Sequence, residues 1–183
     1  LEREISRLRA LLDEGQWVGQ DLPFGLEGVW LAMRRDLAIE ARLCEYLRDL
    51  VRSTPLPCWP QPEVLATLEE VKASASPPPS EEQVLAVRRA LAGSLCVISG
   101  GPGTGKTSVV VLILRALVRL GLNPGEIALA APTGKAAKRI GESLGKALGQ
   151  IQASPAEEAL VANPPEARTL HRLLGYSPTR RGF

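Results

Sequence analysis

The chain has 183 residues, a formal net charge of +2 and a hydrophobic content of 45%. This length suits one domain with an attached segment rather than two complete domains. The three cysteines, Cys44, Cys58 and Cys96, lack the C-x-x-C spacing of a zinc site and do not indicate a disulfide framework, so we expect buried or incidental thiols. Because no apolar stretch is long enough to cross a membrane and the start has neither a signal peptide nor an initiator Met, we expect a soluble, cytoplasmic fragment of a longer protein.

The first 75 residues are predicted to form a small helical domain that contacts a partner. Apolar residues recur at helical spacing over residues 1–14 and 27–51, and a shorter helix at 63–72 follows a proline-rich turn. Residues 73–80 have the Ala, Ser and Pro content of a linker, so we place the domain boundary between residues 75 and 76. The three tryptophans serve either a core or a partner interface, and we favour the core.

Residues 76–183 alternate between predicted helices and strands. A helix over 80–91, with Ser80 as its N-cap, precedes a buried strand at 95–99 and an apolar helix at 108–120 that ends at Gly121. A strand at 126–131, a helix at 136–148 and a short helix at 168–174 follow, without a further strand. This order predicts an α/β fold with parallel strands.

A glycine-rich run between the first strand and the second helix has the spacing G-x-x-x-x-G-K-[ST], which is typical of a phosphate-binding P-loop. In such a loop backbone N–H groups surround the β-phosphate, while Lys106 reaches the β- and γ-phosphates and Thr107 binds Mg²⁺. We therefore expect Lys106 and Thr107 to be catalytic. A chance glycine-rich turn is the alternative, and the flanking strand and helix argue against it. The expected nucleotide ligands here are Gly100, Gly101, Pro102, Gly103, Thr104, Gly105, Lys106, Thr107 and Ser108.

Three further segments carry candidate binding residues. The amide of Gln83 could read the edge of adenine, although an exposed helical Gln is common. At the carboxyl end of the second strand, Pro132, Thr133, Gly134 and Lys135 offer a hydroxyl, a glycine and a cation to a phosphodiester backbone, and an ordinary helix cap has the same appearance. Thr169 and His171 are candidates for the same role, with capping or packing as the alternative.

The charge is unevenly distributed along the chain. Residues 1–76 carry nine basic and thirteen acidic side chains, whereas residues 77–183 carry thirteen basic and seven acidic ones, a net charge of +6. A positive half suits a polyanionic partner such as nucleic acid, although ordinary solvated arginines give the same balance.

Taken in order, the segments around Gln83 and at 97–107, 129–137 and 169–175 closely resemble the RecD family of superfamily 1 DNA helicases, which includes the RecD subunit of the bacterial RecBCD (exodeoxyribonuclease V) helicase–nuclease. They correspond to that family's adenine-reading glutamine motif and its motifs I, Ia and Ib. The resemblance implies a RecA-like P-loop NTPase sheet, with ATP and Mg²⁺ as cofactors. It also implies a 5′-to-3′ motor on single-stranded DNA, acting beside RecB-like and RecC-like subunits in double-strand break repair and recombination.

The sequence departs from this family at the acids that hydrolysis requires. The family supplies an Asp-Glu pair from a later strand, but this chain has no Asp after Asp49, and none of its later glutamates ends an apolar strand. We therefore expect residues 76–183 to be the first part of a motor domain that binds ATP without hydrolysing it. The alternatives are a nucleotide-binding assembly module without motor activity and a P-loop ATPase that acts on protein.

Overall fold

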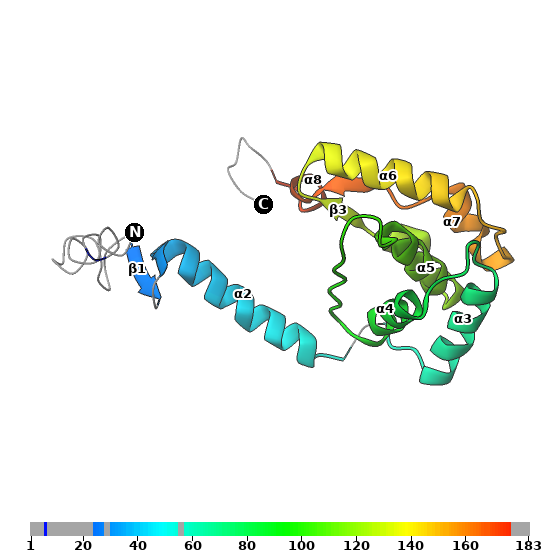
Figure 1. The fold of residues 1–183 in the computed structure, drawn as a ribbon, viewed down its shortest axis with the longest axis horizontal. Helices are drawn as coiled ribbons and strands as arrows, with labels where there is room; N and C mark the ends of the chain where they lie inside the picture. Colours follow the sequence, from blue (N-terminus) through cyan, green and yellow to red (C-terminus); the bar gives the residue numbers. More distant parts are fainter. Residues whose placement is uncertain (1–5, 7–23, 28–29, 55–56, 177–183) are drawn as a thin grey trace. The chain divides into compact units, whose positions relative to one another are not determined.

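The structure is a computed structural model that describes residues 6, 24–27, 30–54 and 57–176 (Figure 1). The chain divides into two compact units, residues 1–53 and 54–183. The boundary expected between residues 75 and 76 therefore falls inside the second unit, because helix α3 (Gln61–Ala73) packs against α4 (Glu81–Ala92) and α5 (Lys106–Arg119) of that unit. Apart from Ser6, the helix predicted at 1–14 lies outside the described residues, as does Trp17.

The first unit contains a β-hairpin that the sequence pattern did not reveal. Strand β1 (Phe24–Glu27) pairs antiparallel with β2 (Trp30–Met33), and helix α2 (Arg34–Arg52) follows directly. The helix predicted from residue 27 thus begins seven residues later. Gly25 and Gly28 are poor helix formers, and the apolar and aromatic residues around them favour a strand, so propensity outweighs the apparent helical spacing.

The second unit is a mixed helix and strand structure with a short parallel sheet. Strands β3 (Leu129–Ala131) and β4 (Ala167–Thr169) run parallel, with Ala131 opposite Thr169. This arrangement confirms the predicted α/β class and is that of an incomplete P-loop NTPase fold. Besides α3, the helices of this unit are α4 (Glu81–Ala92), α5 (Lys106–Arg119), η1 (Pro124–Glu126), α6 (Gly134–Leu148), η2 (Pro155–Glu157), α7 (Glu158–Ala162) and α8 (Leu170–Leu173).

Two strand predictions in this unit were wrong. Residues 95–99 form no strand, because the described residues place no neighbouring strand against them, and Val97 is 83% exposed. Conversely, β4 was missed, because the helix predicted at 168–174 included Arg168 and Thr169. A strand of three residues shows no alternation of its own, and only its pairing with β3 identifies it.

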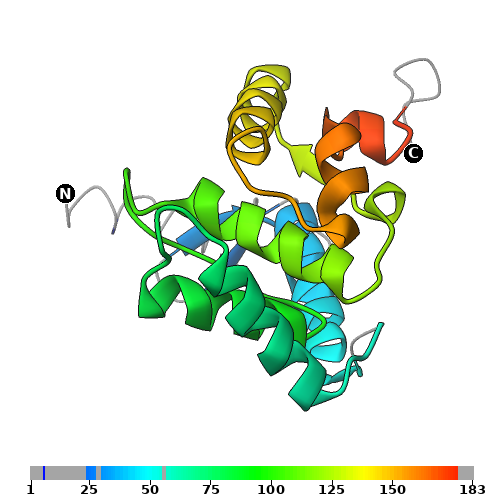
Figure 2. The ribbon, with the colours of Figure 1, turned by 90° about the vertical axis from the view of Figure 1, so that its right-hand side faces the viewer.

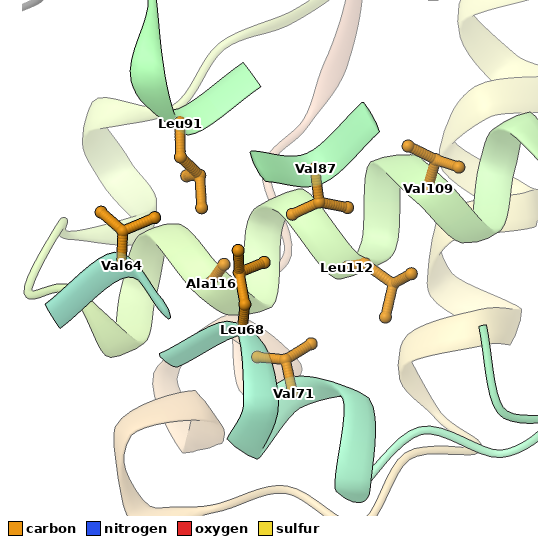
Figure 3. Close-up of a cluster of buried hydrophobic side chains, with 8 residues drawn as sticks. All are labelled: Val64, Leu68, Val71, Val87, Leu91, Val109, Leu112 and Ala116. Carbon is orange, nitrogen blue, oxygen red and sulfur yellow. The ribbon is translucent and has the colours of Figure 1, made fainter. Parts of the chain in front are cut away.

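Helix α5 lies at the centre of the second unit (Figure 2). One of its faces, with Val109, Leu112 and Ala116, packs against α3 and α4, and Figure 3 shows these side chains turned toward those of the two neighbouring helices. Its other face, with Val111, Leu114 and Val118, packs against α6 and α7. A helix that is apolar on both faces is buried between layers, which explains the long apolar run that follows the P-loop.

Two smaller groups of side chains were also assigned from the sequence. Trp59 is half-buried and packs against the cluster formed by α3, α4 and α5, and its Nε1 donates to the carbonyl of Leu120 at 2.9 Å, so it lies at the edge of the core. The cysteines are free thiols, but Cys44 and Cys58 are exposed rather than buried, and Cys96 is half-buried. Across the described helices, none has the length and apolar character needed to cross a membrane.

Candidate nucleotide-binding site

The glycine-rich loop ends in a backbone conformation that exposes the start of α5. Gly103 and Gly105 have φ angles of +78° and +74°, in the left-handed region that favours glycine. Gly105 is the N-cap of α5, no side chain caps the helix, and its first turn contains no acid. The first N–H groups of this 14-residue helix and the positive end of its dipole therefore face the loop and suit an anion.

The ammonium group of Lys106 lies over the backbone of the glycine-rich loop. Lys106 Nζ donates to the carbonyl oxygens of Gly100 at 2.8 Å and Gly101 at 2.6 Å, and Thr104 Oγ1 donates to Gly101 O at 3.0 Å. Phosphate oxygens are stronger acceptors for an ammonium group than neutral carbonyls are. Lys106 and Thr107 are both exposed, so these residues fit a triphosphate with its Mg²⁺.

Gln83 lies against the same loop. Its backbone N–H donates to Ser80 Oγ at 3.3 Å, and its side-chain Oε1 accepts from Ser80 N at 3.0 Å, which completes a capping box at the start of α4. A Cβ built on Gly105 would lie 2.5 Å from Gln83 Nε2. The side chain is therefore a helix cap and, at the same time, a neighbour of the phosphate loop.

The two candidate DNA segments meet at the carboxyl edge of the sheet. Thr133 caps α6 by accepting from Ala136 N at 3.3 Å, and Thr169 caps α8 by accepting from Arg172 N at 3.2 Å. Because Ala131 pairs with Thr169, the two capped helices begin beside each other. Both threonines thus have the capping role that was the alternative to DNA contact, and a DNA role for them stays a prediction.

The other candidates in these segments are open to solvent. Pro132, Gly134 and Lys135 are exposed at the start of α6. His171 is also exposed, and its ring meets that of Tyr176 edge to face, with centroids 5.0 Å apart.

A cavity of about 410 Å³ lies beside Lys106 and Thr107 at the end of the phosphate loop. The first turn of α5 forms one wall, and β3 with α6 forms the other. Its lining residues are Lys106, Thr107, Val110, Leu129, Ala130, Arg139, Ile140, Ser143 and Leu144. Of the expected site residues, Lys106 and Thr107 line this cavity, whereas residues 132–135, Thr169 and His171 do not.

The later glutamates have other partners or other positions. Glu126 accepts from Asn123 N at 3.0 Å, Glu142 pairs with Lys138, and the Arg168 guanidinium lowers the pKa of Glu166. Glu157 is buried and Glu158 is exposed on α7. Among the described residues, none of these carboxylates lines the cavity beside Lys106 and Thr107, and no group of His, Cys, Asp and Glu there could hold a metal ion.

Sequence reasoning missed a group of side chains that anchors α5, here called the α5 ion cluster and comprising Glu70, Ser74, Arg115, Arg119 and Glu157. Arg115 and Glu157 have side chains only 1% and 0% exposed, and Arg115 Nε donates to Glu157 Oε1 at 2.7 Å. Arg119 Nε donates to the same oxygen at 2.9 Å. The only sequence signal was a pair of arginines four residues apart within an apolar helix.

The cluster also determines the charge state of its carboxylate. Burial alone would raise the pKa of Glu157, but hydrogen bonds from Arg119 and Arg115, and from the backbone of Ser154, outweigh burial and lower this pKa to about 2. Glu157 is therefore ionised at neutral pH. Its ion pairs connect α5 to η2. Arg119 also donates to Glu70, and both arginines donate to Ser74, which lies at the end of α3.

Comparisons with known proteins agree with this geometry. The RecBCD enzyme subunit RecD of Haemophilus influenzae is 33% identical over 160 residues, which cover 86% of this chain and 25% of the relative. The corresponding subunit of Mycobacterium tuberculosis is 41% identical over 105 residues, or 55% of this chain and 18% of the relative. The ATP-dependent RecD2 DNA helicase of Deinococcus radiodurans is 38% identical over 104 residues, or 57% of this chain and 11% of the relative.

The chain thus spans a quarter or less of the length of these relatives. The family described as the AAA domain matches residues 83–183, which is more than half of the chain and begins at Gln83. Its match contains the phosphate loop, the cavity beside it and both capped helix starts at the edge of the sheet. The chain therefore belongs to the AAA domain family, and its sequence is RecD-like.

Proposed function

We propose that this chain is the nucleotide-binding part of an ATP-dependent DNA helicase subunit of the RecD type. The observation that carries the proposal is the phosphate loop at the uncapped start of α5, where Gly103 and Gly105 hold left-handed conformations and Lys106 lies over the loop. The similarity to RecD and RecD2 helicases supports the motor function of the whole protein.

Each residue of the loop has a definite task in this proposal. The backbone N–H groups of residues 100–108 surround the phosphates, Lys106 offsets their charge, and Thr107 holds Mg²⁺. When bound, Mg²⁺ neutralises charge on the β- and γ-phosphate oxygens. Gln83, beside Gly105, faces the base. Because no carboxylate of the described residues lines the cavity beside Lys106 and Thr107, residues 1–183 should bind ATP and show negligible turnover, even with single-stranded DNA present.

The partner of the sheet edge in this proposal is single-stranded DNA. Residues 132–135 and Thr169 with His171 lie at the carboxyl ends of two paired strands, and residues 77–183 carry a net charge of +6. The RecBCD names of two relatives support membership in a heterotrimer with RecB-like and RecC-like subunits. In that setting the whole protein would move 5′ to 3′ in double-strand break repair and recombination, in the cytoplasm where the DNA lies.

The two alternative functions are less well supported. An assembly module without motor activity, or an ATPase that acts on protein, would also use a P-loop, but one matched relative is named an ATP-dependent DNA helicase and others are named RecD subunits of the RecBCD enzyme. The cavity beside Lys106 and Thr107 is also lined by α6, the helix that begins at Gly134, which suits a protein in which nucleotide and DNA sites communicate.

Nucleotide binding is tested with Lys106→Ala and a fluorescent ATP analogue. Loss of the ammonium group should remove most of the affinity, because it removes the cation that offsets the phosphate charge. The matched control is Lys138→Ala, which removes an exposed lysine of α6 and should bind normally. Unchanged affinity in folded Lys106→Ala would contradict the proposal.

DNA binding is tested with the double variant Lys135→Ala, His171→Ala in the complete protein with its partner subunits. Affinity for single-stranded DNA and DNA-stimulated ATP hydrolysis should both fall, and ATP binding without DNA should persist, because neither side chain belongs to the phosphate loop. Equal DNA affinity of variant and wild type across a salt series would favour the assembly module instead.

A further inference from the structure

The cavity beside the phosphate loop has a cationic side chain on each of its two walls. Lys106 lines it from the first turn of α5, and Arg139 lines it from α6. Ser143, four residues after Arg139, lines the cavity as well, so one face of α6 forms this part of the wall. The lysine of the loop and the guanidinium of α6 therefore border the same space.

Among the described residues, no acid neutralises Arg139. The cavity is lined by no Asp or Glu, and none of the ion pairs in this part of the chain includes Arg139. Glu142, three residues further along α6, pairs with Lys138 instead, at 3.8 Å. A concave site that is bordered by charges of one sign concentrates ions of the opposite sign, so this cavity suits an anion.

The proposed nucleotide supplies an anion at this position. Thr107 also lines the cavity, and in the proposed site its hydroxyl holds the Mg²⁺ that bridges β- and γ-phosphate oxygens. The β-phosphate lies against the N–H groups of the loop, so the γ-phosphate is the group that lies beside the cavity. A guanidinium is well suited to it, because its planar fork donates two parallel hydrogen bonds to phosphate oxygens.

We infer that Arg139 binds the γ-phosphate of the bound nucleotide, so that the chain distinguishes a triphosphate from a diphosphate through a residue outside the phosphate loop. ADP lacks this phosphate and offers the guanidinium no such partner. The inference places a contact to the γ-phosphate on α6, the helix that begins at the candidate DNA segment. It rests on the proposed nucleotide function and adds a specificity-determining residue to that site.

The test is a pair of equilibrium titrations in the presence of Mg²⁺, one with ADP and one with a non-hydrolysable ATP analogue. In Arg139→Ala the affinity for the analogue should fall about tenfold or more, the value of a hydrogen bond between charged groups, and the affinity for ADP should not change. Arg139 is exposed, so the truncation should leave the fold intact. Lys138→Ala is the matched control: it removes the same charge from the neighbouring position, which does not line the cavity, so the wild-type ratio of the two affinities should persist.

Two results would overturn the inference. A wild-type ratio of the two affinities in Arg139→Ala would show that the guanidinium does not contact the γ-phosphate, whether both affinities are unchanged or both fall together. An equal change of this ratio in Lys138→Ala would show that the net charge of α6 alone is responsible. Neither result affects the phosphate loop, whereas normal binding of both nucleotides by Lys106→Ala would contradict the proposed function itself.

Discussion

Glu157→Gln probes most directly how the nucleotide-binding helix is held in the fold. Gln has nearly the same shape as Glu, but it lacks the negative charge and one acceptor oxygen. In the wild type the Glu157 carboxylate accepts from Arg115, from Arg119 and from Ser154 N at 2.8 Å. The substitution leaves the Arg115 guanidinium, whose side chain is 1% exposed, without a counter-ion in the core.

Two estimates of the cost agree. Removing one partner of a buried ion pair typically destabilises a protein by about 3–5 kcal/mol, because an uncompensated charge remains. Independently, the decrease in the pKa of Glu157 from 4.5 to about 2 corresponds to at most about 3 kcal/mol of preference for the ionised form in the folded state. Because Gln retains one acceptor and Arg119 keeps its bond to Glu70, we expect a loss of about 3 kcal/mol.

The measurement is the free energy of unfolding from urea titrations of wild type and variant at neutral pH. Glu166→Gln is the matched control, since Glu166 forms an exposed pair with Arg168 at 2.7 Å that should contribute less than about 1 kcal/mol. A loss below about 1 kcal/mol for Glu157→Gln, equal to that of the control, would refute the claim that the α5 ion cluster anchors the helix.

Two further predictions follow from the same structure. Because the pKa of Glu157 is lower in the folded than in the unfolded chain, its contribution should be complete above about pH 4.5 and disappear as the pH falls toward 2, so acid unfolding curves of wild type and Glu157→Gln should converge in that range. Gly105→Ala places a Cβ at φ +74° and against Gln83 Nε2, so it should lower the free energy of unfolding by about 1–2 kcal/mol and also lower ATP affinity. The control Gly121→Ala, at φ +92° in open space, should lower the free energy of unfolding alone. Intact ATP binding by Gly105→Ala would contradict the loop geometry.

The sequence predicts the helices correctly where one residue type or one hydrophobic period determines the local structure. The Ser80 cap predicts the start of α4, and the helices predicted at 108–120 and 136–148 each begin two residues earlier, at Lys106 and Gly134. These features depend on residues that are neighbours in the chain, so a local pattern contains them.

Features that depend on distant partners could not be predicted in this way. Strand β4 exists through its pairing with β3, and residues 95–99 form no strand because no described strand lies beside them. The contact between Gln83 and Gly105 joins two helix starts more than twenty residues apart, and the ion pair of Arg115 with Glu157 spans 42 residues. The hydrophobic periodicity within one segment contains no information about which distant segment it contacts.

The position of the α5 ion cluster along α5 gives a final prediction, on function rather than stability. Lys106 and Arg115 are nine residues apart on one helix, or about 13 Å at 1.5 Å per residue, and they share no hydrogen-bonding partner. Effects at such separations are usually independent. Under conditions where Glu157→Gln is fully folded, its ATP affinity should therefore equal that of the wild type, as titration with a fluorescent ATP analogue will measure. A tenfold loss of affinity in the folded variant would show instead that the cluster positions the phosphate loop, and that α5 transmits a disturbance at its buried middle to its first turn.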